Sequence, residues 1–235
     1  MRMRFWIVGL LVLLSGCSYP EQEITVFSIS FPFSDIDHGW TGDFADYPEA
    51  DSITYELYFN HDFLPENLLV TDTTSGLHIS GNNGSDDLFM FIKKKILGLQ
   101  PNTSYELLFN VKVASNAKTG AVGVGGAPGE SVFLKVGASI VEPQKELQAG
   151  MYRMNIDKGN QAEEGSDMIN IGHIGVGSAT TEFTIITRTN SSDNSFRITT
   201  DDTGELWLVI GTDSGFEGTT TLYYTQVDVL FNELN

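Results

Sequence analysis

The sequence has a single cysteine, Cys17, and it is poor in basic residues, with 13 lysines and arginines against 31 aspartates and glutamates. One thiol allows no intramolecular disulfide, so a hydrophobic core must hold the fold together. The formal net charge of −18 leaves no broad basic surface for phosphates, and we therefore expect no nucleic-acid partner. Runs of about twenty apolar residues, which a membrane-spanning helix needs, are also absent from the sequence.

The amino-terminal segment has the pattern of a secretory signal. Residues 1–4 include two arginines, and residues 5–14 are apolar. This stretch is too short to remain in a membrane as an anchor. Residues 14–17, Leu-Ser-Gly-Cys, resemble the lipobox of bacterial lipoproteins, which implies cleavage before Cys17 and acylation of its thiol. An ordinary signal peptide with a chance cysteine is the alternative.

The resemblance to a lipobox implies a location in the cell envelope and the membrane as a partner through the amino-terminal lipid. Two or three acyl chains anchor a protein stably without any other membrane contact. Ser18 stands where an aspartate would retain an enteric lipoprotein in the inner membrane, so we expect the outer membrane, on its periplasmic or surface face. Loss of the leader would leave 11 basic against 31 acidic residues.

The sequence pattern of the remaining chain predicts β-strands throughout. In residues 105–113 every odd position is apolar, and residues 223–231 repeat this alternation, which is typical of half-buried strands. Glycine-rich turns such as residues 81–85 and 211–215 separate the segments, and no helical stripe of ten residues follows the leader. We therefore expect an all-β, antiparallel β-sandwich, with a signal peptide at 1–16, a tether at 17–23 and a single domain at 24–235.

Two of these segments resemble a known family. Residues 98–107, Gly-Leu-Gln-Pro-Asn-Thr-Ser-Tyr-Glu-Leu, are similar to a turn and strand opening of galactose-binding-like jelly rolls and carbohydrate-binding modules. Residues 218–231 are similar to their last strand. The resemblance implies a jelly-roll sandwich that binds a carbohydrate. Similar strings also occur in fibronectin-type sandwiches.

Residues 35–47 contain four carboxylates and three aromatic residues other than histidine around a glycine turn. Calcium prefers six to eight oxygen ligands from spaced carboxylates and carbonyls, so structural calcium is a candidate cofactor. Its candidate ligands are Asp35, Asp37, Asp43 and Asp46. The spacing is not that of an EF-hand, and a polar loop without metal is the alternative.

Two further clusters carry the side chains that a sugar needs. Asp157, Asn160 and Gln161 bring acid and amide groups into one loop, which suits hydroxyl groups. Trp207 precedes a turn with Asp213 and Glu217, and aromatic faces stack on sugar rings. Trp40 is a further candidate for such stacking, and core packing is the alternative for each tryptophan.

Catalytic motifs find little support in the sequence. The four histidines lack zinc-ligand spacing, and residues 129–133 lack the closing glycine of a nucleophile elbow. We therefore expect a binding protein for carbohydrate or a similar polar ligand. A glycan-active hydrolase or lyase, and a structural envelope lipoprotein that binds another protein, are the alternatives.

Overall fold

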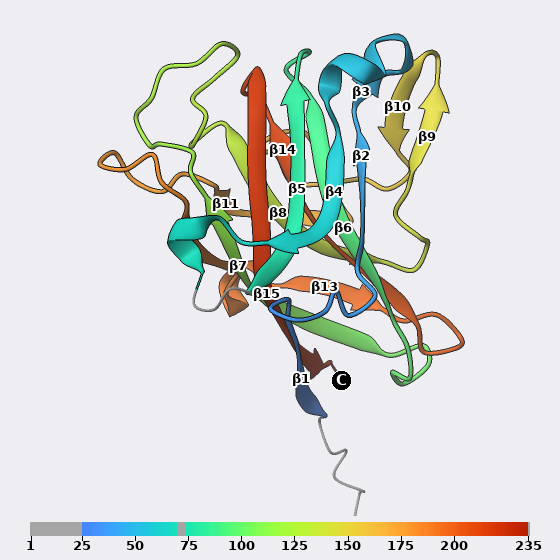
Figure 1. The fold of residues 1–235 in the computed structure, drawn as a ribbon. Coiled ribbons are helices and arrows are strands. Elements are labelled where there is room, and N and C mark those ends of the chain that lie inside the picture. The colour runs from blue at the N-terminus through green and yellow to red at the C-terminus, as the bar shows by residue number, and fades with distance from the viewer. Residues whose placement is uncertain (1–24, 70–73, 235) are drawn as a thin grey trace, which may run out of the picture.

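The computed structural model describes residues 25–69 and 74–234, so Cys17, the leader and the tether lie outside the described residues. Three antiparallel sheets make up the fold (Figure 1). The largest has the order β12-β7-β15-β5-β4, with β1 beside β15 and β13 beside β7. Its strands are β1 (Val26–Pro32), β4 (Tyr58–Phe63), β5 (Ser75–Asn83), β7 (Ser104–Ser115), β12 (Thr184–Thr189), β13 (Phe196–Thr199) and β15 (Gly218–Glu233).

The second sheet has five strands in the order β11-β8-β14-β6-β2. They are β2 (Thr41–Ala45), β6 (Leu88–Ile96), β8 (Val132–Ser139), β11 (Met168–His173) and β14 (Leu206–Ser214). A small third sheet joins β3 (Tyr47–Pro48), β10 (Met151–Met154) and β9 (Lys145–Gln148). Three short 3₁₀ helices complete the described elements: η1 (Glu49–Tyr55), η2 (Glu66–Leu68) and η3 (Ser192–Asn194).

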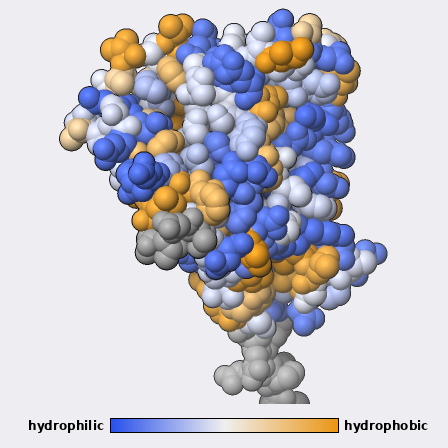
Figure 2. Space-filling model, in the orientation of Figure 1, coloured by the Kyte–Doolittle hydropathy of each residue, from blue (hydrophilic) through white to orange (hydrophobic). Residues whose placement is uncertain are grey.

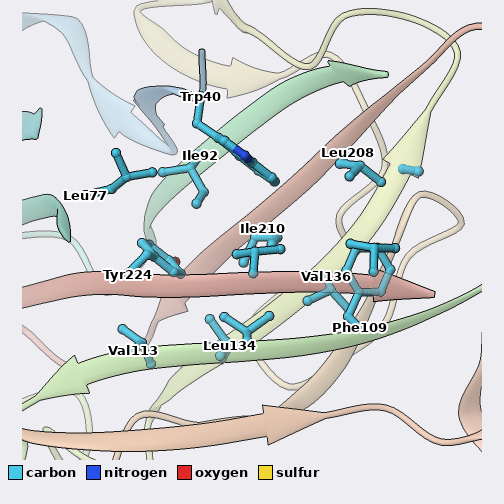
Figure 3. Close-up of a cluster of buried hydrophobic side chains, with 14 of the residues drawn as sticks. Trp40, Leu77, Ile92, Phe109, Val113, Leu134, Val136, Leu208, Ile210 and Tyr224 are labelled. Carbon is cyan, nitrogen blue, oxygen red and sulfur yellow. The ribbon is translucent and has the colours of Figure 1, made fainter. Parts of the chain in front are cut away.

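The two large sheets pack face to face around one apolar core (Figure 3). Alternate residues of each strand point inward, as in β7, where Phe109 and Val113 are buried while Asn110 and Lys112 reach the surface. Leu134 and Ile210 meet them from the five-stranded sheet. Strands β5 to β8 alternate between the two sheets, which is the connection pattern of a jelly roll.

The outer side of the five-stranded sheet carries a second, smaller core. Phe89, Phe91 and Val209 on this side are buried with Ile156 and Met168. Gly137 allows the segment after β10 to lie directly on the sheet, because a Cβ there would come 1.9 Å from the carbonyl oxygen of Asp167. This covering segment, residues 155–167, closes the outer side of the sheet.

The predicted all-β, antiparallel sandwich is confirmed, with some differences in the elements. Apolar residues alternate along residues 53–60, which predicts a strand there, but this prediction is wrong in its first part, since residues 49–55 form η1 and β4 begins only at Tyr58. Strands β2 and β11 were missed, because β2 lies in the acid-rich segment and β11 mixes glycine and asparagine with its apolar residues. Within the described residues, no helix is long and apolar enough to cross a membrane.

Candidate functional site

A pocket of about 350 Å³ opens beside the segment that covers the five-stranded sheet. It lies near β3, β9 and β10, at the end of the sandwich opposite β1 (Figure 1). We call it the charged pocket, because acids and bases make up much of its lining. The lining residues are Asp46, Asp87, Arg153, Met154, Ile156, Asp157, Lys158, Gly159 and Asn160.

Asp157 shapes the loop that forms one wall of the charged pocket. Its two carboxylate oxygens accept backbone N–H groups of Gly159 at 3.1 Å and Ser166 at 2.9 Å. The same two N–H groups, with that of Ser166 first, hold the pKa of the Asp157 carboxyl below its usual value. Gly159 has a φ of +71°, and an added Cβ would come 2.2 Å from the carbonyl oxygen of Glu163, so this tight loop requires glycine.

Four charged side chains meet between the loop and the sheet, and we call them the buried charge cluster: Lys135, Lys158, Asp46 and Asp213. Lys135 is fully buried and donates hydrogen bonds to the carbonyl oxygens of Lys158 at 2.6 Å and Glu163 at 2.7 Å. Asp213 Oδ2 lies 2.7 Å from Lys158 Nζ and 3.4 Å from Lys135 Nζ, and it also accepts the backbone N–H of Gln161 at 2.9 Å. The cluster therefore fixes the loop to the sheet from below.

The two lysines of the cluster have opposite pKa shifts. Burial lowers the pKa of Lys135, and the attraction of Asp213 only partly offsets this effect. Burial would also lower the pKa of Lys158, but the attraction of Asp213 and Asp46 outweighs it, so this pKa is raised. Lys158 is therefore the firmly charged member at the edge of the pocket.

Arg153 connects the cluster to the pocket opening. Its Nη1 atom lies 2.9 Å from Asp87 Oδ2 and 3.3 Å from Asp46 Oδ1. Asp46 Oδ2 lies 3.0 Å from Lys158 Nζ, an ion pair whose geometry falls outside that of a hydrogen bond. Burial, and then the negative charge of Asp46, raise the pKa of Asp87. The pocket thus presents fixed, paired charges, with the Arg153 side chain 42% exposed at its mouth.

The structure brings together one of the two predicted ligand-binding clusters and part of the other. Asp157 and Asn160 line the pocket, and Gln161 binds the carbonyl oxygen of Asp86 through Nε2 at 3.2 Å. Asp213 lies directly below them, but it is fully buried and supports the loop instead of facing a ligand. Its Oδ1 atom is buried without a hydrogen-bond partner among the described residues.

The remaining predicted ligand residues lie elsewhere. Trp40 is in the main core, 2% exposed, with its ring edge-on to Phe31 and Phe33, so the packing alternative describes it (Figure 3). Trp207 is partly exposed on β14, and Lys93 Nζ lies 5.5 Å from its ring centroid. Glu217 forms a backbone bridge with Val124 and does not line the pocket.

The four predicted calcium ligands do not form one site. Asp35 accepts a hydrogen bond from Ser34, and Asp37 accepts the backbone N–H of Gly39. Asp43 pairs with Lys145 at 2.8 Å, and Asp46 belongs to the buried charge cluster. No group of three metal-ligating side chains occurs among the residues that the structure describes. These carboxylates therefore do not fit a shared calcium ion.

The sequence analysis missed Asp87, Arg153 and the two lysines of the buried charge cluster. One signal was available, because Lys135 stands at the centre of the otherwise apolar run Val132-Phe133-Leu134-Lys135-Val136-Gly137. A lysine in such a position is either buried with a partner or marks a solvent-facing side. Arg153 and Asp87 gave no comparable signal, because they are far apart in the sequence and meet only in the fold.

No protein-family model and no curated protein matches this sequence. The chain is similar to solved β-sandwich carbohydrate-binding proteins. One match, carbohydrate-binding modules of the β-sandwich superfamily with promiscuous specificity, has 11% identity over 92% of this chain and 77% of the other, with a TM-score of 0.41. A putative sugar-binding protein from Bacteroides thetaiotaomicron has 12% identity over 82% and 88% of the two chains and a TM-score of 0.37. The amino-terminal modules of endo-1,4-beta-D-xylanase 10B from Clostridium thermocellum, complexed with xylohexaose, have 14% identity and a TM-score of 0.41. That match covers 88% of this chain and only 28% of the xylanase chain.

Proposed function

We propose that the protein binds a carbohydrate in the charged pocket, as a lipid-anchored lipoprotein of the cell envelope. The observation that supports binding is the convergence of an acid, a guanidinium, an amide and an apolar wall around one cavity. Asp87, Arg153 and Asn160 supply acceptors and donors, and Met154 and Ile156 supply the apolar surface. Sugars need this combination, because their hydroxyls both donate and accept hydrogen bonds while their C–H faces are apolar.

The paired charges favour an uncharged ligand over a strongly ionic one. Asp46 and Asp87 share the Arg153 guanidinium, and Lys158 is paired with Asp46 and Asp213. A charged ligand would have to compete with these partners, whereas a hydroxyl can add to them without breaking an ion pair. The ligand class that fits is a neutral sugar.

A hydrolase or lyase is the less favoured alternative. Hydrolysis of a glycoside uses two carboxyl groups on either side of the scissile bond. Asp46 and Asp87 are close together in the pocket, but Arg153 Nη1 hydrogen-bonds both. Both carboxylates are therefore already engaged with the arginine, which disfavours their use as a general acid and a nucleophile.

Anchoring through Cys17 would place the pocket away from the bilayer. Residue 17 is nine positions before the first residue of β1, Val26. Strand β1 lies at one end of the sandwich, and β9 and β10, which flank the pocket, lie at the other (Figure 1). A lipid attached ahead of β1 would therefore leave the pocket facing the surroundings of the membrane, on either face of the outer membrane.

A glycan array probed with the full chain in detergent tests the binding proposal. The informative variant is Asn160→Ala, because Asn160 is exposed and its side chain makes no hydrogen bond within the described structure. We expect about a fivefold to tenfold loss of affinity for any bound glycan, the effect of one lost hydrogen bond. Asn116→Ala, at another exposed asparagine outside the pocket, is the matched control and is expected to bind normally. No bound glycan, or equal binding by both variants, would refute the proposal.

Anchoring has its own test. We expect the chain to fractionate with membranes and to incorporate a palmitate analogue, and Cys17→Ser to lose both properties. An unmodified residue 17 in the mass spectrum of the membrane-associated protein would contradict it.

Release of reducing ends from the bound glycan would point to the hydrolase, and co-purification of a stoichiometric envelope protein without glycan binding would point to the structural alternative.

A further inference from the structure

Two fully buried charged side chains lie on neighbouring strands of the five-stranded sheet. Charged side chains usually stay in water, and Figure 2 shows hydrophilic residues spread over the visible face of the molecule. Lys135 on β8 and Asp213 on β14 are exceptions, because both side chains are 0% exposed. Their strands are paired, with Lys135 opposite Gly211 and Asp213 opposite Phe133. The two side chains are therefore diagonal neighbours on one face of the sheet, within reach of each other.

The amine of Lys135 has two hydrogen-bond acceptors and one carboxyl group around it. Its Nζ atom donates to the carbonyl oxygens of Lys158 at 2.6 Å and Glu163 at 2.7 Å, and it lies 3.4 Å from Asp213 Oδ2. The two carbonyls can take both N–H groups of a neutral amine, which leaves its lone pair for Asp213. Burial favours this neutral form, since it lowers the pKa of Lys135. Lys135 is thus placed as a nucleophile beside a carboxyl group.

The carboxyl group of Asp213 has one oxygen that is held and one that is not. Oδ2 accepts hydrogen bonds from Lys158 Nζ at 2.7 Å and from the backbone N–H of Gln161 at 2.9 Å. Two donors at such distances stabilise the negative oxygen of a tetrahedral intermediate in acyl transfer. Oδ1 is buried without a hydrogen-bond partner in the part of the chain that the structure describes. Oδ2 is therefore the oxygen that stays, and Oδ1 is the oxygen that can leave.

We propose that Lys135 and Asp213 form an intramolecular amide bond, which links β8 to β14. The new bond joins Lys135 Nζ to Asp213 Cγ, and the bond from Cγ to Oδ1 breaks. Lys135 brings three protons as an ammonium group, of which one stays on the amide nitrogen and two leave with Oδ1 as water. An ammonium and a carboxylate thus give one amide and one water molecule, so the reaction needs no oxidant, reductant or co-reactant.

Burial favours the amide over the separated charges. An ammonium and a carboxylate lose their hydration between the loop and the sheet, whereas an amide carries no charge. The released water can leave through the charged pocket, whose lining includes Lys158 and Gly159. The single cysteine allows no disulfide within the chain, so the amide would be a covalent link of another kind. The reaction involves no ligand, and it therefore does not depend on the function proposed for the pocket.

Lys158 is not the amine that reacts. Its Nζ atom lies closer to Asp213 Oδ2, at 2.7 Å, but it also pairs with Asp46 Oδ2 at 3.0 Å. Burial would lower the pKa of Lys158, but the attraction of Asp213 and Asp46 outweighs burial and raises it. Lys158 therefore stays an ammonium group, which has no lone pair for an attack. Its part in the reaction is to hold Oδ2.

The test is a tryptic digest of the denatured full chain, because denaturation separates an ion pair but leaves an amide intact. Trypsin does not cleave after a lysine whose amine is acylated. We therefore expect a linked pair of peptides, residues 119–145 and 198–235, with a mass about 18 Da below the sum of the two. Fragmentation of this pair should place the link at Lys135 and Asp213.

The variants Lys135→Met and Asp213→Ala should give no linked pair. Lys112→Met, the same change on the outer side of β7, is the matched control and should give the pair as the parent does. If the parent is linked, Lys135→Met should also lower Tm by more than its lost hydrogen bonds explain. The mass of the parent digest needs no variant, so a variant that fails to fold does not remove the test.

The digest of the parent chain decides the proposal. Only separate peptides, residues 119–135 and 198–235, would overturn the link. A link at Lys158 in place of Lys135 would overturn the assignment of the reacting amine. Neither result would touch the glycan proposal, which the binding of Asn160→Ala tests by itself.

Discussion

Replacing Lys135 with methionine removes the ammonium group from the buried charge cluster while it keeps the length of the side chain. Lys135 Nζ donates to the carbonyl oxygens of Lys158 at 2.6 Å and Glu163 at 2.7 Å, and methionine cannot donate to either. Each buried acceptor left unpaired costs about 1–3 kcal/mol. Asp213 keeps Lys158 and the backbone N–H of Gln161 as partners, so its own loss is small.

Removing a buried charge also relieves a desolvation cost, which is the reason that the pKa of Lys135 is lowered. The net destabilisation of Lys135→Met is therefore about 2–4 kcal/mol, less than the sum of the losses. For a domain of this size about 1 kcal/mol shifts Tm by 2–4 °C, so we expect Tm to fall by about 5–15 °C. Calorimetry of the full chain measures the shift directly.

Lys112→Met is the control for this experiment. Lys112 lies on the outer side of β7 and donates only to Gln226 Oε1, at 3.0 Å, so its loss should cost less than about 1 kcal/mol. We also expect Lys135→Met, but not Lys112→Met, to weaken glycan binding, because only Lys135 holds the pocket loop. A Tm for Lys135→Met equal to or above that of the parent would show that the burial cost exceeds the bonding, and would refute this account of the cluster.

Other substitutions and conditions test separate parts of the structure. Trp40→Ala should lower the free energy of unfolding by about 3–5 kcal/mol in urea titration, because Trp40 is 2% exposed in the core; a change below about 1 kcal/mol would contradict its packing role. Gly137→Ala should destabilise the chain by about 1–3 kcal/mol, because the new Cβ meets the carbonyl oxygen of Asp167. Gly98→Ala is the control, since a Cβ there meets no atom within 4 Å. It should cost about 1 kcal/mol from backbone strain alone, because Gly98 has a φ of +79°. The lowered pKa of Asp157 stabilises the fold above its unfolded value of 3.8, and this contribution is lost as pH falls through the lower folded pKa. Asp157→Asn should therefore show a smaller loss of Tm between pH 5 and pH 2 than the parent, and an unchanged profile would contradict this assignment. A calcium chelator should leave Tm unchanged, and a fall would reveal a site that the carboxylates described here do not explain.

The strands were largely predictable because each half-buried strand has a period of two. The long strands β7 and β15 followed from this pattern alone. The pattern failed where local chemistry competed with it. Residues 53–55 contain isoleucine, threonine and tyrosine, which favour strands, yet they end a 3₁₀ helix that packs Tyr55 against the ring of Tyr47.

The candidate site was predictable only in part. Asp157 and Asn160 were found because they are neighbours in an unusual polar loop. The other lining residues Arg153 and Asp87 come from β10 and from the turn between β5 and β6, and only the packing of the covering segment on the sheet brings them into the same pocket.

The pairing of β1 with β15 has a mechanical consequence. The two strands are antiparallel and in register from Val26 opposite Asn232 to Pro32 opposite Gln226, and Phe27 stacks on Phe231 with centroids 5.0 Å apart. A force applied through the residues ahead of β1 would act along this strand, whereas the hydrogen bonds between β1 and β15 are perpendicular to it. All hydrogen bonds between β1 and β15 would then share the load, instead of breaking one after another.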